Sequence, residues 1–467
     1  MAKTNLIWIM ADQLRADMVG CNGDPNVHTP NIDALAAGGA NFTRALSTNP
    51  LCCPARASMI TGLYPQNCGV YGHEYRLDSS KETIADVLNR YGYHTAYIGK
   101  WHLDGWHERV SRAAFHVVPP ERRARFKYWM GYENNNSQYD CWIHGGDGKT
   151  EVPPTKLEGY ETDAMTDVLI NHLKTIPKDQ PFFAVMSVQP PHNPYVAPER
   201  NRNYDPDKLI LRPNCMPDLP PYKEFNDYTR KGLANAYAMI ENFDENVGKI
   251  VKYLKDTGIY DNTILMVFSD HGDTHGSHGQ QRKTNPYEES IRVPFIVGGK
   301  RIAITNDHVG IKLDCLLSSV DVAPTTLGLL GIDTPRDWEG CDYSVACKRN
   351  VVDFSYPESA YIQSIIPEHH PHSVEVAWRG VVTRDGWKYV CLDNTPWMLF
   401  DLNTDPYELR NLACCGLYRA QRARLSLMLQ DWINRTHDNF RIAPISFNTD
   451  IIEHERDKFG YPDYPED

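Results

Sequence analysis

The chain lacks long apolar runs and long runs of one charge. No apolar stretch approaches the roughly 20 residues that a membrane-spanning helix needs, so the sequence predicts no membrane partner. The net charge is −12 over 467 residues, and no extended basic stretch is present, which argues against nucleic acid as the main partner. An anionic substrate would therefore need local lysines, arginines or a metal ion to overcome the overall negative field.

The N terminus and the cysteines lack the marks of a small secreted protein. After Met1 the chain runs almost directly into the apolar stretch 6–10, which is too short for the core of a signal peptide. As written, the sequence predicts a cytoplasmic protein; if a leader was removed, the protein would be periplasmic or secreted. The 12 cysteines are spread without the spacing of a disulfide framework or a zinc site, so most are expected to be reduced.

The chain does contain a regular alternation of strand-like and helix-like segments. Continuous apolar runs predict strands at 6–10, 95–99, 182–188, 263–268 and 293–297. Helical spacing of apolar residues predicts helices at 31–38, 83–91, 162–174 and 228–254. Fully apolar strands that alternate with helices indicate an α/β fold, in which a large, mixed and mostly parallel sheet lies between layers of helices.

The pattern changes in the last quarter of the chain. Alternating segments at 374–383 and 387–392 indicate antiparallel strands, and 421–432 is expected to be a helix packed on that small sheet. We therefore predict two domains, a catalytic α/β domain at 1–350 and a smaller α+β subdomain at 351–467. The polar last thirty residues are expected to wrap the surface.

Polar side chains follow four of the predicted strands, at the ends where ligands bind in such sheets. They are Asp12 and Gln13, Lys100 and His102, His192, and Asp270 and His271. Oxygens from Asp12, Gln13 and Asp270 suit a hard divalent cation such as calcium. The nitrogen of His271 is better tolerated by manganese. A single aspartate at a strand end is more often a cap or a turn residue, so the prediction of a site rests on the convergence of four strand ends.

The segment 51–62 holds the most informative motif. Cys52 is followed by Pro54 and Arg56 at an expected helix start, where the helix dipole and a guanidinium favour a nucleophile or an anion. The string at 52–62 resembles the modification signature C-x-[P]-x-R-x-x-x-x-T-G of the type I, formylglycine-dependent sulfatases of the alkaline phosphatase superfamily. In that family a formylglycine-generating enzyme oxidises the cysteine, and the hydrated aldehyde is the nucleophile. The resemblance implies that Cys52 is converted and Cys53 is not.

Two further strings resemble the same family. Residues 92–102 match G-Y-x-T-x-x-x-G-K-x-H at every named position, and the loop around Lys283 is similar to the family's lysine loop. The resemblance implies that Lys100 and Lys283 bind sulfate oxygens. It also implies that His102 hydrogen-bonds the formylglycine hydroxyl and acts as a base, and that His192 protonates the leaving alcohol.

The resemblance further implies an alkaline-phosphatase-like fold and one divalent cation. The expected ligands are Asp12, Gln13, Cys52, Asp270 and His271. Gln13 stands where the family usually has a second aspartate, which removes one negative charge. Calcium is the family expectation, and manganese stays an alternative because of His271. Arg56 is expected to join the metal in stabilising the ionised diol at position 52.

These features predict a sulfatase that hydrolyses the sulfate ester of a carbohydrate or of another small organic molecule. A phosphonate monoester or phosphodiester hydrolase of the same superfamily is the first alternative, although the string at 99–102 favours sulfate esters. A homologue that keeps the fold, stays unmodified and only binds its ligand is the second. The sequence leaves the oligomeric state open, including a homo-oligomer.

Three other groups of charged residues have no catalytic role in this scheme. One lies within 109–128 and consists of Arg112, Arg122, Arg123, Arg125 and Lys127. We interpret it as a solvated insertion or an oligomer contact, with contact to a further anionic group of a sulfated sugar as the alternative. Another consists of Asp273, His275 and His278, whose spacing favours structural, solvent or substrate roles over a second metal site. Glu288 and Arg292, four residues apart, are expected to form a structural ion pair.

Overall fold

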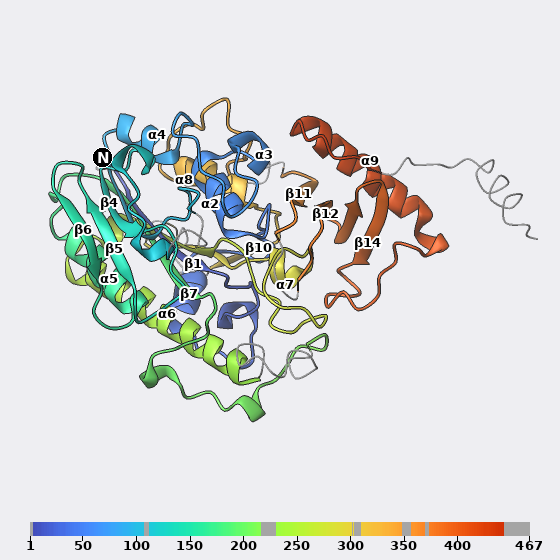
Figure 1. The fold of residues 1–467 in the computed structure, drawn as a ribbon, viewed down its shortest axis with the longest axis horizontal. Helices are drawn as coiled ribbons and strands as arrows, with labels where there is room; N and C mark the ends of the chain where they lie inside the picture. Colours follow the sequence, from blue (N-terminus) through green and yellow to red (C-terminus); the bar gives the residue numbers. More distant parts are fainter. Residues whose placement is uncertain are drawn as a thin grey trace, which may run out of the picture.

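A ten-stranded sheet forms the centre of the structure (Figure 1). The structure is a computed structural model and describes residues 3–106, 112–215, 230–300, 302, 310–347, 356–368 and 373–442. The strands of this sheet are β1 (Asn5–Asp12), β2 (Ala40–Phe42), β3 (His94–Lys100), β4 (Tyr128–Tyr132), β5 (Trp142–Gly146), β6 (Glu151–Lys156), β7 (Phe182–Pro191), β8 (Thr263–Ser269), β9 (Phe295–Gly298) and β10 (Ile311–Leu313). Their order across the sheet is β10-β2-β9-β8-β1-β7-β3-β4-β5-β6.

Five neighbouring strands in the middle of this sheet are parallel. β8, β1, β7, β3 and β4 run in one direction, whereas β9 and β5 pair antiparallel with the outer members of this group. Every residue of β1 is buried. Leu6 and Trp8 contribute to one apolar cluster and Ile7 and Ile9 to another, because successive side chains of a strand face opposite sides of the sheet. The predicted mixed, mostly parallel sheet is confirmed.

Helices cover both faces of this sheet (Figure 1). The helices of this layered unit are α1 (Pro30–Ala37), α2 (Cys52–Thr61), α3 (Pro65–Cys68), α4 (Ile84–Arg90), α5 (Glu161–Leu173), α6 (Arg230–Asp256), α7 (Glu288–Ile291) and α8 (Val322–Leu329). α2, α4 and α8 pack into the cluster around Trp8, and α1, α5 and α6 into the cluster around Ile7. The described helices include none that is both long and apolar enough to cross a membrane.

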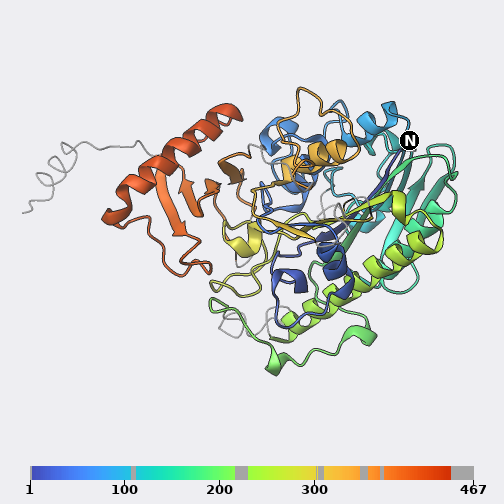
Figure 2. The ribbon, with the colours of Figure 1, turned by 180° about the vertical axis from the view of Figure 1, so that it is seen from behind.

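A separate four-stranded antiparallel sheet lies on the C-terminal side of the molecule (Figure 2). Its strands are β11 (Ser359–Ser364), β12 (Trp378–Thr383), β13 (Trp387–Leu392) and β14 (Thr395–Asp401). α9 (Arg419–Arg435) packs on one face through Leu425 and Leu429, and the other face meets Leu46 and Ile291 of the larger unit. The predicted small sheet with its helix is confirmed. The boundary at residue 350 and most of the last thirty residues lie outside the described residues, so the domain limits and the surface-wrapping tail stay predictions.

The strands that the sequence did not predict lie mostly at the sheet edges. β6 is exposed at every residue and contains two prolines, so it has no apolar alternation to reveal it. β2 and β10 are only three residues long. The strand predicted at 293–297 exists as β9, but it begins at Phe295, and its pairing with β8 is antiparallel. Short length or exposure therefore explains why β2, β6 and β10 were not predicted, whereas β4, β5 and β11, which the sequence also did not predict, are mostly buried.

A buried lysine links the small sheet to α7 of the larger unit. Lys388 of β13 is fully buried, and its Nζ lies 3.1 Å from a carboxylate oxygen of Glu288 and also contacts Glu408. Glu288 starts α7 and pairs with Arg292 at 3.6 Å, as the sequence predicts. Because both carboxylates are withdrawn from water, the ammonium of Lys388 is what compensates for their burial.

Replacement of Lys388 by methionine should lower the free energy of unfolding by about 3–5 kcal/mol, because it removes the cation that two buried carboxylates share and leaves only the contact of Glu288 with Arg292. Urea unfolding followed by circular dichroism measures the change. Lys249→Met is the matched control, since this lysine is 43% exposed and pairs with Asp167 at 2.5 Å. We expect that control to change the stability by less than about 1 kcal/mol. Equal losses in the two variants would contradict the role of Lys388.

Candidate active site

The candidate site lies where four strands end and one helix begins. β1, β7, β3 and β8 are neighbours with parallel directions, so their carboxyl ends meet at one edge of the sheet. These ends, or the turns after them, place Asp12, Lys100, His192 and Asp270 at that edge. The helix α2 starts beside them with Cys52 as its first residue. The structure thus brings together the residues that the sequence predicts for the site.

Cys52 is buried among positive charges. Its Sγ lies 3.0 Å from Lys283 Nζ, 3.2 Å from His271 Nε2 and 4.0 Å from Lys100 Nζ. Burial would raise the pKa of this thiol, but the charges of Lys100, Lys283 and His271 outweigh burial and hold the pKa well below the ordinary range. The site therefore favours a negative charge at position 52.

Cys53, one residue later, has the opposite environment. It belongs to the apolar cluster around Trp8, and its Sγ donates to the backbone carbonyl of His73 at 3.1 Å. Burial, followed by the charge of Cys52, raises the pKa of the Cys53 thiol well above the ordinary range. Neighbouring positions on a helix point in different directions, and only Cys52 faces the strand ends.

Arg56 holds the two aspartates of the site in place. Its Nε donates to Asp270 at 2.9 Å, and one Nη donates to Asp12 at 3.2 Å. The other Nη donates to the backbone carbonyl of Lys100 at 3.0 Å and to Ser187 Oγ at 2.8 Å. The planar guanidinium thereby fixes the ends of four strands relative to one another. Its described hydrogen bonds go to these groups and not to the thiol.

The two buried aspartates have carboxyl pKa values shifted in opposite directions. Burial and the Cys52 charge oppose ionisation of Asp12, but Lys100, whose Nζ is 2.6 Å from Oδ2, and Arg56 hold its pKa below the usual range. Burial, and then the charge of Asp12, raise the pKa of Asp270. Two carboxylates in one buried site repel each other, so a cation bound between them would be stabilised.

These groups form a candidate metal centre. Ligand atoms of Asp12, Cys52, Asp270 and His271 all lie within 4.8 Å of one another. The ring of His271 is oriented by a hydrogen bond of 3.0 Å from Nδ1 to the carbonyl of Gly272, which directs Nε2 toward the other ligands. Besides the Cys52 sulfur, the donor set combines oxygens with one nitrogen. With a formylglycine oxygen in place of that sulfur, it would fit either calcium or manganese.

Gln13 adds an amide oxygen to this centre. Its backbone N–H donates to Asp270 at 3.1 Å, and its Nε2 donates to Asp273 at 2.5 Å. The bond to Asp273 fixes the amide orientation, because the oxygen would be repelled by that carboxylate. Oε1 is left buried, and none of the described residues donates a hydrogen bond to it. A buried oxygen without a donor fits a ligand of a hard cation.

Lys100 and His102 extend the site on the other side of Cys52. Burial alone would lower the pKa of Lys100, but Asp12 and Cys52 raise it above the ordinary value, so the ammonium stays charged. Burial lowers the pKa of His102 to about 3, although hydrogen bonding to Cys52 opposes this shift. The ring of His102 is therefore neutral near pH 7, and it is a weak base unless a nearby negative charge raises its pKa. It stacks on His73, with ring centroids 5.3 Å apart.

His192 is fixed by its own loop. Its Nδ1 donates to the carbonyl of Asn193 at 2.6 Å, so in the neutral ring Nε2 carries the lone pair. Burial and the charge of Lys283 lower the pKa of His192 well below its ordinary value, while Asp12 opposes this shift. A bound anion would raise that pKa again, as a proton donor to a leaving group requires.

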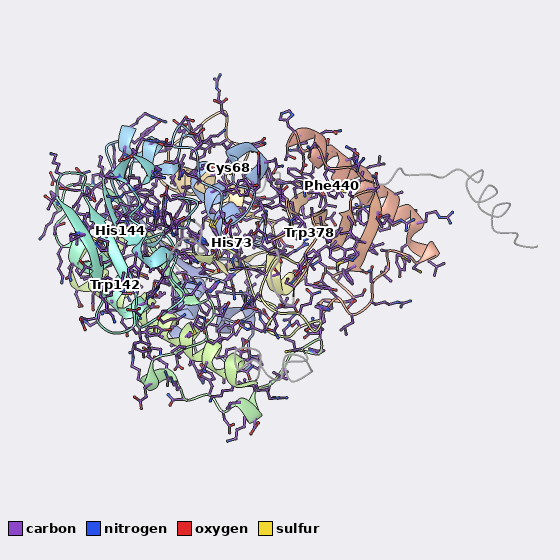
Figure 3. All side chains as sticks on the ribbon, in the orientation of Figure 1. Cys68, His73, Trp142, His144, Trp378 and Phe440 are labelled. Atoms are coloured by element: carbon purple, nitrogen blue, oxygen red, sulfur yellow. The ribbon has the colours of Figure 1, made fainter. Side chains whose placement is uncertain are left out.

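The loop that carries Lys283 is held from the C-terminal unit. Trp378 of β12, labelled in Figure 3, donates its Nε1–H to the carbonyl of Thr284 at 2.8 Å. Ser373 donates to the carbonyl of Lys283, and the N–H of Thr284 donates to Pro50 at 3.1 Å. Sequence reasoning missed Ser373 and Trp378, because neither belongs to a motif and the two are distant in sequence from the loop that they hold.

The basic residues at 112–127 do not form one free cationic patch. Each has its own partner: Arg112 pairs with Asp140, Arg122 with Asp104, Arg123 with Glu151 and Arg125 with Asp86, while Lys127 donates to the carbonyl of Tyr93. Four different carboxylates therefore neutralise the four arginines. Residues 107–111, within the same segment, lie outside the described residues.

The histidine-rich loop before Lys283 forms a second cluster of metal-type ligands. His278, Glu289 and Glu408 have ligand atoms within 4.8 Å of one another. Asn214 donates to Glu289 at 2.8 Å and lies 3.0 Å from the Nε2 of His278, and Lys388 pairs with Glu408. One oxygen of Glu289 and the carboxylate of Glu408 already have a donor or a cation, whereas Oε2 of Glu289 is buried without a donor among the described residues. The contacts present support a structural role for this loop.

Comparison with known proteins identifies the family. The sulfatase family model matches residues 4–332, and the model for the C-terminal part of N-sulphoglucosamine sulphohydrolase matches residues 276–435. The chain belongs to the sulfatase family. It is 33% identical to the ulvan-active sulfatase of Formosa agariphila over 445 residues, which cover 94% of this chain and 83% of the relative. The predicted enzyme class, a sulfuric ester hydrolase, is confirmed.

Solved structures confirm the alkaline-phosphatase-like fold of this sulfatase. A Bacteroides thetaiotaomicron protein from work on glycosaminoglycan metabolism has a TM-score of 0.81 at 25% identity, over 94% of this chain and 97% of that one. The phosphonate monoester hydrolase of Agrobacterium radiobacter has a TM-score of 0.73 at 21% identity, over 93% and 96% of the two chains. The catalytic role of each site residue stays a prediction.

Before conversion, the sulfatase should carry a thiolate at Cys52 near neutral pH. Because the pKa of Cys52 is lowered and that of Cys53 is raised, only Cys52 should be deprotonated at about pH 7. The ultraviolet absorbance of the thiolate, titrated in unconverted protein, should fall in Cys52→Ala and be unchanged in Cys53→Ala. A Cys52 signal that develops only above about pH 8.5, the range of an ordinary thiol, would contradict the prediction.

Proposed function

We propose that this sulfatase hydrolyses the sulfate ester of a carbohydrate or of another small organic alcohol, with a formylglycine made from Cys52 and one divalent cation. The observation that carries the proposal is the position of Cys52, at a helix start and within 4.0 Å of the ammonium groups of Lys100 and Lys283. The similarity to an ulvan-active sulfatase supports a sulfated carbohydrate as substrate.

The burial of Cys52 restricts when its conversion takes place. The residue is 1% exposed in the folded chain, so a formylglycine-generating enzyme could not reach it there. Conversion must therefore precede complete folding, while the segment around Cys52 is still extended. This timing makes the maturation enzyme a transient partner of the unfolded chain.

The residues around position 52 have separable roles in sulfate ester cleavage. Formylglycine would supply a hydrated aldehyde. One hydroxyl would attack sulfur and become sulfated as the alcohol leaves, and loss of the proton from the second hydroxyl would re-form the aldehyde and expel the sulfate. Lys100 and Lys283 bind the non-bridging sulfate oxygens and neutralise their charge. His192 gives a proton to the alcohol oxygen as the S–O bond breaks. His102, whose pKa is lowered to about 3, has a neutral ring, and it would act as the base when the negative charge of the bound intermediate raises that pKa.

The cation would be held by the strand ends. Asp12, Gln13, Asp270 and His271 offer three oxygens and one nitrogen, and calcium or manganese would polarise a sulfate oxygen there. Arg56 keeps Asp12 and Asp270 oriented whether or not the metal is bound. The orphaned Oε1 of Gln13 is the observation of this structure that the cation explains.

Activity assays and the mass of the Cys52 peptide also test two alternative functions. The shared fold with a phosphonate monoester hydrolase keeps that activity as an alternative, and parallel assays on aryl sulfate, phosphate diester and phosphonate monoester distinguish the two. A non-catalytic binding protein would keep Cys52 unmodified and release no sulfate from any ester.

Conversion of Cys52 should be visible by mass and required for turnover. In protein produced with a formylglycine-generating enzyme, the peptide that contains Cys52 should be lighter than the cysteine form by about 18 Da. Cys52→Ala should lower kcat/KM for aryl sulfate by at least about 1000-fold, because the nucleophile is lost. Cys53→Ala is the matched control and should keep most of the activity. Full turnover by a protein with unmodified Cys52 would exclude the formylglycine mechanism.

Removal of the Gln13 amide should weaken the metal site. We expect calcium or manganese to raise the unfolding temperature of the wild type, since a ligand that binds the folded state stabilises it. Gln13→Leu should weaken metal affinity at least about 10-fold by calorimetry, because one ligand oxygen is lost. Gln363→Leu, at a buried glutamine bonded to Gln66 at 2.8 Å, is the control and should leave the affinity unchanged. Equal affinity in Gln13→Leu and wild type would show that this amide is no ligand.

A further inference from the structure

A carboxylate from the C-terminal unit reaches the site from outside the predicted motifs. Glu368 lies just after β11, and its side chain is only 9% exposed. One of its oxygens lies 3.6 Å from Nδ1 of His73, which Figure 3 shows near the middle of the molecule. The other oxygen lies against Gly72, where an added Cβ would come within 1.9 Å of it. A side chain at position 72 would thus displace this carboxylate.

Short contacts connect Glu368 to the reacting centre. His73 stacks on His102, with ring centroids 5.3 Å apart and an interplanar angle of 17°. His102 in turn hydrogen-bonds the side chain of Cys52. The backbone carbonyl of His73 also accepts from Cys53 at 3.1 Å. The ring of His73 therefore separates Glu368 from His102, which is the residue that contacts position 52.

Glu368 is poorly suited to bind the sulfate group itself. Sulfate is an anion, and a nearby carboxylate repels it. Burial raises the pKa of the Glu368 carboxyl, while the side chain and backbone amide of His73 oppose this shift. Its Oε1 is buried, and no donor to that oxygen exists among the described residues. Because Oε1 of Glu368 is a buried acceptor without a donor, a hydroxyl group on the alcohol part of the substrate could donate a hydrogen bond to it.

The loop that carries His73 has the other features of a sugar-binding surface. Tyr71 and Tyr75 flank His73 on this loop, with ring centroids 5.2 Å apart, and Tyr75 is 37% exposed. Partly exposed aromatic rings offer an apolar surface to the C–H face of a sugar, and a few placed polar groups fix its orientation. A carboxylate accepts hydrogen bonds from hydroxyl groups with particular strength.

We propose that Glu368 and His73 form the subsite for a ring hydroxyl next to the scissile ester, so that the substrate of this sulfatase is a sulfated sugar. Glu368 accepts the hydroxyl proton through Oε1, and His73 positions the carboxylate through its contact with the other oxygen. This inference rests on the proposed sulfate ester hydrolysis and specifies its substrate class.

The central experiment compares two substrates in Glu368→Gln. Sulfate release is measured with 4-nitrophenyl sulfate and with a panel of hexoses and N-acetylhexosamines that are monosulfated at different ring positions. For the best sugar substrate, kcat/KM should fall about 10- to 100-fold, as expected for loss of a hydrogen bond to a charged group. For 4-nitrophenyl sulfate, which has no ring hydroxyl, the change should stay within about threefold.

Two further variants separate recognition from stability. Gly72→Ala keeps Glu368 but displaces its carboxylate, so it should reproduce the sugar-selective loss. Glu358→Gln is the matched control, because this glutamate belongs to the same unit but is 77% exposed and paired with Arg384 at 3.5 Å. Glu358→Gln should leave both substrates unaffected.

A deoxygenated sugar tests the hydroxyl directly. If Glu368 binds it, removal of the hydroxyl next to the ester should cost the wild type about 10-fold or more and cost Glu368→Gln much less, because the two changes remove the same bond. Equal losses in both proteins would overturn the proposal. A parallel loss of activity on sugar and aryl sulfates would also overturn it, as would a preference for choline sulfate that depends on Glu368.

A binding measurement distinguishes failure of this inference from failure of the proposed function. Calorimetry with Cys52→Ala and the sugar sulfates does not require turnover. Weaker sugar binding in the double variant with Glu368→Gln would support the subsite even if no ester is hydrolysed, whereas equal binding would exclude it. Absence of hydrolysis with an unmodified Cys52 would instead count against the proposed function.

Discussion

The bridge from Arg56 to Asp12 and Asp270 is the interaction on which the site depends. The parallel strands deliver two carboxylates to one buried edge, and without a cation between them they would repel each other. Arg56 satisfies both, and its remaining donors fix Lys100 and Ser187 on the two other strands. The guanidinium is fully enclosed, so its hydrogen bonds are not shared with water. The positions of Asp12, Asp270 and the end of β3 around position 52 follow from this bridge.

The same bridge explains the charge balance of the site. With Cys52 as thiolate, three negative groups, which are the thiolate and the two aspartates, face the cations Arg56, Lys100, Lys283 and His271. The proposed conversion of the thiolate to a neutral aldehyde would remove one negative charge. A sulfate ester carries one negative charge and would replace it. The low pKa of the Cys52 thiol therefore reflects the positive charges that would also attract an anionic substrate.

Much of the site could be predicted because its residues follow apolar strands. Asp12, Lys100 and Asp270 each come directly after a fully buried run, and parallel strand ends converge by geometry. The contacts that hold Lys283 could not be predicted, because Ser373 and Trp378 are 90 and 95 positions away from it and belong to the other sheet. The orientation of Gln13 likewise depends on Asp273, which comes from a different strand end.

The C-terminal unit contributes side chains that hold residues of the site in position. Trp378 and Ser373 hold the backbone next to Lys283, Lys388 neutralises the carboxylates at the end of that loop, and Glu368 reaches the other side through His73. Sulfate-binding groups come mainly from the strand ends, which the motifs define. The groups that we propose to recognise the rest of the substrate come from the segment after β11 and from the loop after α3, which no motif constrains. This division lets the sulfate chemistry stay fixed while the alcohol specificity varies.

The contrast between Cys52 and Cys53 shows that the positively charged environment is limited to one position of the helix. The two thiols are adjacent in one helix, yet one faces three cations and the other faces the apolar cluster under the sheet. A helix turns about 100° per residue, so a shift of one position would move the nucleophile out of the site. If Cys52 is converted as proposed, its buried position also means that the modifying enzyme must read the extended sequence, since the folded chain hides the thiol. The string at 52–62 would then specify both a linear recognition signal and a helix start.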